Sequence, residues 1–273
     1  MQVTFLADEA RHLLFPEVRV AKECDATPEA REICVRDFAQ RVREIVGLER
    51  HAVCPHPATR PELCPECDAW AVSTAATLLD RLPEARTLLE GDIEAALEGD
   101  PAANSAAEVV LCYPGFFAIA THRIAHVLYE CGARLVPRLM SEQAHARTGI
   151  ELHPGAQIGP RFFIDHGTGV VVGETAVLGA RCRLYQGVTL GARAIPKGDA
   201  MRTRKRHPTL DDDVTIYANA TILGGDVVIG KGAVIGGNTW VTSSVPAGAR
   251  MRIDVAARVA EAVVMVPDGA QPE

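Results

Sequence analysis

From Leu152 to Val245 the chain repeats a unit of six residues, and an aliphatic residue leads each unit. A small residue often follows the leader, as in Ile158-Gly159 and Ile235-Gly236. A fixed period of six predicts a β-solenoid, in which each unit forms one short strand and its leader points into a narrow core. A β-sandwich would instead alternate with period two and show turn signals every ~8–12 residues. The leaders are Leu152, Ile158, Ile164, Val172, Leu178, Leu184, Leu190, Leu210, Ile216, Ile222, Ile229, Ile235 and Val241.

Before residue 150 the pattern changes to apolar residues at helical spacing among Ala, Leu, Glu and Arg. Thr27 followed by Pro28 predicts the start of a helix that runs to about Gly47. We therefore expect an α-helical domain over residues 1–149, a solenoid over 150–245 and a tail with a short helix over 246–273. Further helices are expected over residues 68–79, 83–97, 116–130 and 137–148.

Net charge narrows the choice of partners. A formal charge of −7 and a pI near 5.7 argue against a nucleic-acid partner, which usually requires a basic face. The insertion between Leu190 and Leu210 is a local exception, and is either a solvated loop or a field that attracts an anionic substrate or cofactor phosphates. Its basic residues are Arg193, Lys197, Arg202, Arg204, Lys205 and Arg206.

The N-terminal sequence and the number of cysteines indicate the cellular compartment to be expected. The first fifteen residues include acidic side chains and no apolar signal segment, and no run of about 18 apolar residues occurs. The sequence therefore predicts a protein without membrane spans. Eight cysteines without a secretory signal suggest reduced thiols in the cytoplasm.

A Cys-rich loop over residues 51–67 stands apart from the helical pattern. Cys64 and Cys67 form a Cys-x-x-Cys knuckle, and Cys54 and His56 lie shortly before it, with His51 also nearby. Such a set can bind zinc tetrahedrally, although a surface loop with ordinary thiols fits the same residues. Cys54, His56, Cys64 and Cys67 are therefore candidate ligands of a structural zinc.

The solenoid repeat is interrupted most at two charged pairs. Two extra residues follow the unit that contains Asp165-His166, and the long insertion ends at Arg206-His207. A histidine near a carboxylate can act as a general base, because its unperturbed pKa of about 6.5 lies close to neutral pH. His153, in a Gly-rich turn, is instead expected to be a surface or capping residue.

The sequence motifs around these pairs resemble those of the serine O-acetyltransferases, a family of hexapeptide-repeat acyltransferases. The resemblance covers about residues 90–245, whereas we recognise no resemblance in the first 80 or so residues. The motifs are residues 99–101 (GDP), 113–116 (YPGF), 121–126 (THRIAH), 149–156 (GIELHPGA), 164–169 (IDHGTG), 172–175 (VGET), 187–191 (GVTLG) and 206–208 (RHP).

The resemblance implies an α+β fold with a C-terminal left-handed parallel β-helix, and transfer of acetyl from acetyl-CoA to L-serine at the start of cysteine biosynthesis. It implies that His166 is the general base, with Glu151 at the place of the partner Asp of many relatives. By the same resemblance, the other site residues are Asp100 and Asp165 for the serine amino group, Arg206 and His207 for its carboxylate, and Ala192, Ala218 and Gly237 for acetyl-CoA.

Other activities and partners stay open. The acceptor could be phosphoserine, homoserine or a sugar, and a γ-carbonic-anhydrase-like metal site could use His153, His166 and His207, although the expected spacing is missing. By resemblance, the acetyl-CoA groove lies between subunits of a homotrimer, which could pair into a hexamer, and cysteine is a possible feedback inhibitor. Docking of a sulfhydrylase is doubtful because the chain ends in residues 269–273 (GAQPE) rather than in Ile.

Overall fold

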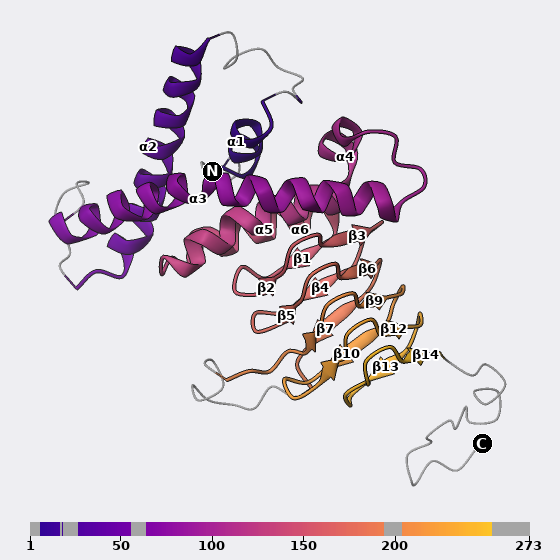
Figure 1. The fold of residues 1–273 in the computed structure, drawn as a ribbon. Helices are drawn as coiled ribbons and strands as arrows, with labels where there is room; N and C mark the ends of the chain where they lie inside the picture. The colour runs from indigo at the N-terminus through magenta and orange to yellow at the C-terminus, as the bar shows by residue number, and fades with distance from the viewer. Residues whose placement is uncertain (1–5, 17, 19–26, 56–63, 194–203, 253–273) are drawn as a thin grey trace, which may run out of the picture.

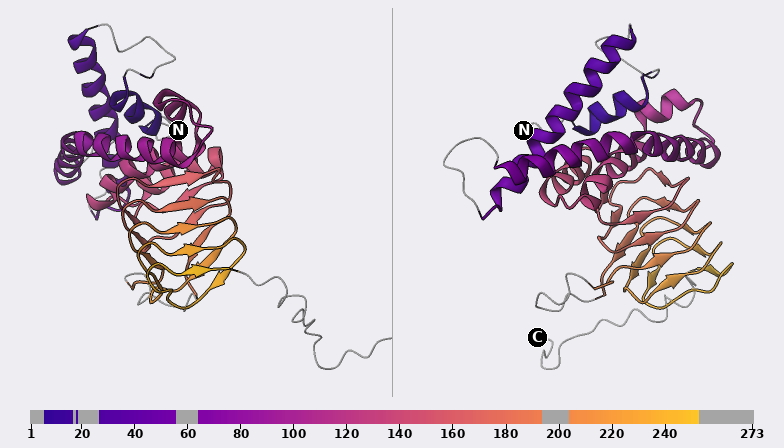
Figure 2. Two further views of the ribbon diagram at one scale, coloured as in Figure 1. Left: turned by 45° about the vertical axis from the view of Figure 1, so that its right-hand side comes forward. Right: turned by 60° about the vertical axis from the view of Figure 1, so that its left-hand side comes forward.

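A layer of helices lies on one end of a three-sided solenoid in the computed structural model (Figure 1), which describes residues 6–16, 18, 27–55, 64–193 and 204–252. Figure 2 shows the coils stacked beneath the helices, with α2 projecting away from the solenoid. The helices are α1 (Leu6–Leu14), α2 (Pro28–Ala52), α3 (Pro65–Gly99), α4 (Ala106–Cys112), α5 (Pro114–Glu130) and α6 (Leu135–Thr148).

Three parallel sheets form the sides of the solenoid, and the chain visits them in turn. Sheet A contains β1 (Glu151–Leu152), β4 (Val171–Val172), β7 (Thr189–Gly191), β10 (Thr221–Leu223) and β13 (Trp240–Val241). Sheet B contains β2 (Gln157–Ile158), β5 (Val177–Leu178), β8 (Thr209–Leu210) and β11 (Val228–Ile229). Sheet C contains β3 (Phe163–Asp165), β6 (Arg183–Tyr185), β9 (Thr215–Ile216), β12 (Val234–Ile235) and β14 (Arg250–Met251).

The predicted repeat determines the register of these sheets. Every leader is buried except Ile158, which is partly exposed where it meets the helices. Val171 pairs with Thr189, 18 positions later, as three units of six require. Across the long insertion Val177 pairs with Thr209, 32 positions later, so the added residues leave the coil at a corner without shifting the strands. The predicted fold class, a helical region followed by a left-handed parallel β-helix, is confirmed.

Helix α5 joins the helical layer to the first coil. A Cβ on Gly115, near the start of α5, would lie 2.4 Å from the carbonyl oxygen of Ile164, so only glycine permits this approach. Arg123 of α5 pairs with Asp92 of α3 at 3.1 Å, and both side chains are buried. Arg123 also donates to the carbonyl oxygen of Gly159 at 2.7 Å, while Asp92 accepts from the amide of Phe162 at 2.8 Å. This buried ion pair therefore connects both helices to the solenoid.

Several element boundaries differ from the sequence expectation. Residues 68–79 and 83–97 belong to one helix, because burial of Leu78 and Leu89 on either side of Pro83 outweighs the helix-breaking tendency of proline. α1 and α4 were not expected, although Ser105 caps α4 by accepting from the amide of Glu108 at 3.2 Å. β14 extends the parallel pairing to Met251, beyond the expected end at Val245. The predicted tail helix falls within residues 253–273, outside the described part of the chain.

Cysteine chemistry in the helical region differs from the expectation of uniformly reduced thiols. Cys112 and Cys131 of this region are free thiols, as is Cys182 of the solenoid, whereas Cys34 is disulfide-bonded. A sequence count alone cannot distinguish these states, because pairing depends on which cysteines the fold brings together. Among the described residues, no helix is both long enough and apolar enough to cross a membrane.

Candidate active site

The first of the two charged pairs lies at the corner between sheets C and A. Asp165 ends β3 and His166 follows it with a φ of 59°, a left-handed conformation that also occurs at the corner residues Asn219 and Asn238. The His166 side chain is 70 % exposed, and its Nε2 lies 3.6 Å from Oδ1 of the mostly buried Asp165. The corner turn thus presents an accessible imidazole beside a carboxylate.

Two residues from the helical layer complete this corner. Asp100 follows the last residue of α3 and accepts a hydrogen bond from the Tyr113 hydroxyl at 2.6 Å. That bond, with a second from the amide of Ala102, lowers the pKa of Asp100, and the charge of nearby His166 acts in the same direction. Bonding to Asp100 raises the pKa of Tyr113 to about 12, so Tyr113 stays protonated at neutral pH. We call Asp100, Tyr113, Asp165 and His166 the Asp–His corner.

The second pair lies at the corner between sheets A and B, in a dense hydrogen-bond network. Arg206 forms a close ion pair with Glu174, which also accepts from the Tyr129 hydroxyl at 2.8 Å. Thr175 Oγ1 accepts from the amides of Arg206 and His207 at 2.9 and 3.0 Å. We call Tyr129, Glu174, Thr175, Arg206 and His207 the Arg–His corner.

His207 is held in one orientation and one tautomer. The Thr175 amide donates to His207 Nδ1 at 3.0 Å, so the proton of the neutral ring belongs on Nε2. Burial, and then the positive charge of Arg206, lower the pKa of His207 to about 4, which keeps the ring neutral at neutral pH. A Cβ on Gly173 would lie 2.1 Å from the His207 ring, so this position must lack a side chain. His207 can therefore donate from Nε2 to an anionic oxygen.

The two corners lie at opposite ends of sheet A. The strands of this sheet are parallel, and His166 precedes β4 whereas Glu174 follows it. Each corner thus carries one half of the predicted substrate site, with acidic groups and a base at one end and an anion-binding pair at the other. Within one chain, a strand of sheet A therefore separates the two halves of the predicted site.

The predicted acetyl-CoA positions divide between the corners. Ala218 and Gly237 lie in the same corner column as His166, in later coils, and the amide of Asn238 donates to the carbonyl of Ala218 at 2.8 Å. A Cβ on Gly237 would lie 3.0 Å from that carbonyl oxygen. Ala192 follows β7 and therefore lies at the Arg–His corner.

The predicted dyad of His166 and Glu151 has no direct contact in this structure. Within the described ranges, Glu151 accepts a hydrogen bond from Arg138 of α6 at 3.0 Å, and the carboxylate beside His166 is that of Asp165. Glu151 begins β1 and pairs with Val171, so it lies one strand from the turn that carries His166. The dyad stays a prediction.

The three solenoid histidines proposed as an alternative metal site are not brought together. His153 accepts from the amide of Gly155 at 3.0 Å, in keeping with a capping role, and it lies near the Arg–His corner rather than near His166. Among the described residues, the one group with metal-binding geometry is His51, Cys54, Cys64 and Cys67. The predicted ligand His56 lies outside the described residues.

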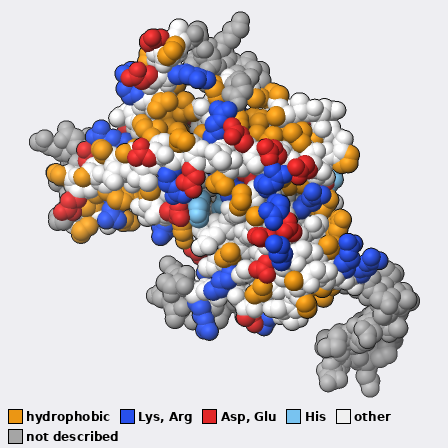
Figure 3. Space-filling model, in the orientation of Figure 1, with side chains coloured by type: hydrophobic (Ala, Val, Ile, Leu, Met, Phe, Trp, Pro, Cys, Tyr) orange, Lys and Arg blue, Asp and Glu red, His pale blue; other side chains and the backbone are white. Residues whose placement is uncertain are grey.

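The described members of the basic insertion are largely engaged in local contacts. Lys205 donates to the carbonyl of Thr175 at 2.8 Å, Arg206 pairs with Glu174, and Arg193 lies 3.4 Å from Asp226. On the face shown in Figure 3, basic and acidic side chains are interspersed rather than gathered into one basic field. Lys197 and Arg202 lie outside the described residues.

No role was predicted for Tyr113, Glu174 or Thr175. All three lie in motifs that carry the family resemblance, so the motifs pointed to them without indicating what they do. Their hydrogen bonds identify Tyr113 as the partner of Asp100, and Glu174 and Thr175 as the groups that orient Arg206 and His207.

Similar proteins come from several organisms. A plasmid serine acetyltransferase of Synechococcus elongatus is 55 % identical over 170 residues, 61 % of this chain and 53 % of the relative. Serine acetyltransferase of Mycobacterium tuberculosis is 50 % identical over 60 % of this chain and 68 % of its own length. The chain thus spans about half of the Synechococcus relative. No family model matches the chain.

Solved structures agree with these relatives. Serine acetyltransferase 1 of Entamoeba histolytica, in complex with L-cysteine, has a TM-score of 0.79 at 36 % identity, over 92 % of this chain and 86 % of that one. A serine acetyltransferase in complex with CoA has a TM-score of 0.58 at 25 % identity, over 91 % and 94 % of the two chains. Sequence and fold therefore agree, and the chain belongs to the serine acetyltransferase family.

Proposed function

We propose that this chain transfers the acetyl group of acetyl-CoA to the hydroxyl of L-serine, giving O-acetylserine and CoA as the opening step of cysteine biosynthesis. The observation that carries the proposal is the pair of complementary corners. The Asp–His corner offers carboxylates for an ammonium group and a base for a hydroxyl, and the Arg–His corner offers a cation and a neutral donor for a carboxylate. L-Serine carries these three groups.

In the proposed reaction His166 removes the proton from the serine hydroxyl as its oxygen attacks the thioester carbonyl. The resulting tetrahedral intermediate collapses, the carbon–sulfur bond breaks, and the imidazolium returns the proton to the leaving sulfur. Asp100 and Asp165 hold the ammonium group, and their charge also stabilises the imidazolium. Glu151 is proposed to support His166, which requires it to exchange its contact with Arg138.

Arg206 and His207 bind the serine carboxylate in this proposal. A guanidinium fixed by Glu174 and an imidazole fixed by Thr175 lose little conformational freedom when the anion binds. Because the corners lie at opposite ends of sheet A, we propose that the Asp–His corner of one chain meets the Arg–His corner of a neighbour in a homotrimer, which could pair into a hexamer. Acetyl-CoA would lie in the same groove, against Ala218 and Gly237 of one chain and Ala192 of the next.

Serine is favoured over phosphoserine because Lys205 and Arg206, which lie in the network of the Arg–His corner, are already engaged. The Lys205 ammonium group is held by backbone carbonyl groups and Arg206 is paired with Glu174, which suits one carboxylate better than a doubly charged phosphate. The test is release of CoA from acetyl-CoA with L-serine, O-phosphoserine, homoserine or a hexose as acceptor. L-Serine should give the highest kcat/KM, and a higher value for any other acceptor would overturn the assignment.

Cysteine is proposed as a competitive inhibitor, because it differs from serine only in having sulfur in place of the hydroxyl oxygen. The complex of the Entamoeba relative with L-cysteine supports this proposal. Inhibition should be followed by loss of thioester absorbance, since the thiol of cysteine would itself react in a thiol assay. The terminal residues on which sulfhydrylase docking would depend lie outside the described part of the chain.

A further inference from the structure

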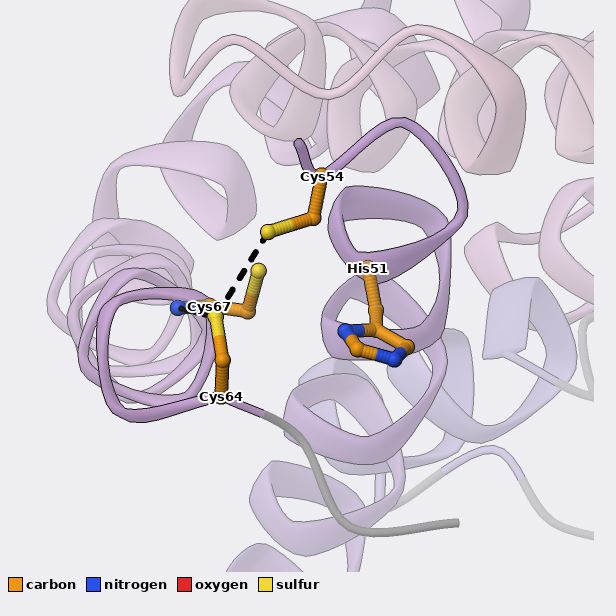
Figure 4. Close-up of side chains that lie close together, drawn as sticks. All are labelled: His51, Cys54, Cys64 and Cys67. Carbon is orange, nitrogen blue, oxygen red and sulfur yellow. Dashed lines mark hydrogen bonds between the residues drawn. The ribbon is translucent and has the colours of Figure 1, made fainter. Parts of the chain in front are cut away.

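Three cysteines and one histidine converge where α2 ends and α3 begins. His51 belongs to the last turn of α2, Cys54 follows that helix, and Cys64 and Cys67 lie at the start of α3. One potential ligand atom from each residue lies within 4.8 Å of those of the other three. Figure 4 shows the three sulfur atoms directed toward a common space, with the imidazole of His51 beside it. We propose that these four side chains bind a structural zinc ion.

The distances fit a tetrahedral thiolate site. A Zn–S bond of about 2.3 Å implies a separation of about 3.8 Å between two sulfur ligands at tetrahedral angles. The Sγ atoms of Cys54 and Cys64 lie 3.6 Å apart, close to that value and well beyond the about 2.05 Å of a disulfide bond. Three thiolates and one imidazole in this geometry form a ligand set that suits zinc.

His51 supplies an independent observation. Its Nδ1 atom is buried and has no hydrogen-bond partner among the described residues. A buried imidazole nitrogen without a partner is unfavourable, and coordination by this nitrogen, or by the other one with a shift of the ring, would engage the side chain.

The knuckle has the backbone support expected of a metal ligand loop. Cys64 is the N-cap of α3, and its Sγ accepts a hydrogen bond from the amide of Cys67 at 3.5 Å. Such bonds orient and stabilise thiolate ligands. Cys67 itself is 2 % exposed, so the bound ion would be shielded from solvent on that side.

The position of the site indicates its role. A zinc ion here would tie the end of α2 to the start of α3. Two residues before His51 in α2, the Glu49 carboxylate accepts from the amides of Leu135 and Val136 at 2.9 and 2.8 Å and so caps α6. The ion would therefore fix the end of α2 that caps the helix leading into the solenoid. This role depends on neither corner of the candidate active site.

Metal analysis of the full chain, purified without chelator, tests the proposal. The wild type should contain about one zinc per chain, and Cys64→Ser and His51→Ala should lose most of it. Cys112→Ser, at an exposed thiol on α4, is the matched control and should keep its zinc. Chelation should lower the Tm of the wild type by more than about 5 °C and leave that of Cys64→Ser nearly unchanged.

Cobalt provides a readout if the variants fail to fold. Wild-type protein loaded with Co²⁺ should show a strong sulfur-to-cobalt charge-transfer band and the visible bands of tetrahedral cobalt. Little zinc in reduced wild-type protein, octahedral cobalt spectra, or a disulfide between Cys54 and Cys64 in freshly purified protein would each overturn the proposal. Zinc retained in folded Cys64→Ser and His51→Ala proteins would overturn it too, by placing the metal elsewhere.

Discussion

The two corners of sheet A differ in how firmly they hold their histidines. The His166 side chain is exposed and has one nearby carboxylate at 3.6 Å, whereas His207 is buried and fixed through Thr175. A general base must reach the substrate to accept its proton, so it needs an accessible side chain. A group that binds a carboxylate loses less conformational entropy on binding when it is already fixed. The contrast indicates that the solenoid places reactivity at one end of sheet A and recognition at the other.

Removing the reactive group should have the largest effect. His166→Ala should lower kcat by about two orders of magnitude or more, because the serine hydroxyl loses its base. CoA release at saturating serine measures the change. His145→Gln, at a partly exposed histidine on α6, is the control and should keep wild-type activity. A His166→Ala enzyme with kcat close to the wild type would contradict the assignment of reactivity to the Asp–His corner.

Mixing two inactive variants tests whether the corners meet between chains. His166→Ala and Arg206→Ala chains should each have little activity, but trimers that contain both variants should recover roughly a third of the wild-type rate, because one of their three interfaces joins two intact corners. Activity of purified mixed oligomers, with their mass measured by light scattering, decides the matter. Absence of recovery in confirmed mixed trimers would place both corners of a working site in one chain.

Loosening the recognition corner should have an intermediate effect. Glu174→Gln removes the charge that orients Arg206, so the KM for serine should rise about tenfold with little change in kcat. Tyr129→Phe removes only the hydroxyl that donates to Glu174 at 2.8 Å, and should raise KM less. Steady-state kinetics at saturating acetyl-CoA separate the two parameters. A fall in kcat with unchanged KM would move Glu174 from recognition to chemistry.

The smallest predicted effect concerns pH and stability. The folded-state pKa of His207 is about 4, below its usual value of about 6.5, so between these values the unfolded chain binds a proton that the folded chain does not. Stability contributed by His207 is therefore present above about pH 6.5 and is lost as pH falls toward 4. The Tm difference between wild type and His207→Gln should shrink by a few degrees between about pH 7.5 and about pH 5.

The comparison with His207→Gln isolates one residue. Buried His122 also has a pKa well below its usual value because of burial, but its contribution is present in both proteins and cancels. A Tm difference that stays constant over this pH range would show that His207 is protonated equally in the folded and unfolded states.

The solenoid could be predicted from sequence because one local rule repeats along it. Each leader, such as Leu184 or Ile216, is buried by its counterparts one coil away, so period alone gives both strand positions and core. The helical layer follows no such rule. The fusion of two expected helices across Pro83 depends on packing by distant helices, which no local signal contains.

The site residues that lie in the family motifs could be predicted from the sequence. Asp165-His166 and Arg206-His207 interrupt the repeat and lie at corners, as the phase of the repeat required. The contact of Glu151 with Arg138 could not be predicted, because it depends on how α6 lies against β1. Spacing alone also could not distinguish His51 from His56 as the fourth ligand, since both lie close to Cys54 in the chain.

Gly173 has a consequence for recognising enzymes among proteins of this shape. The His207 ring occupies the space in which a side chain at position 173 would begin. A homologue with alanine or any larger residue there could retain every titratable group of both corners and still hold its imidazole in the wrong place. When homologous sequences are sorted into enzymes and non-enzymes, a glycine at this position is thus as informative as the histidine that it accommodates.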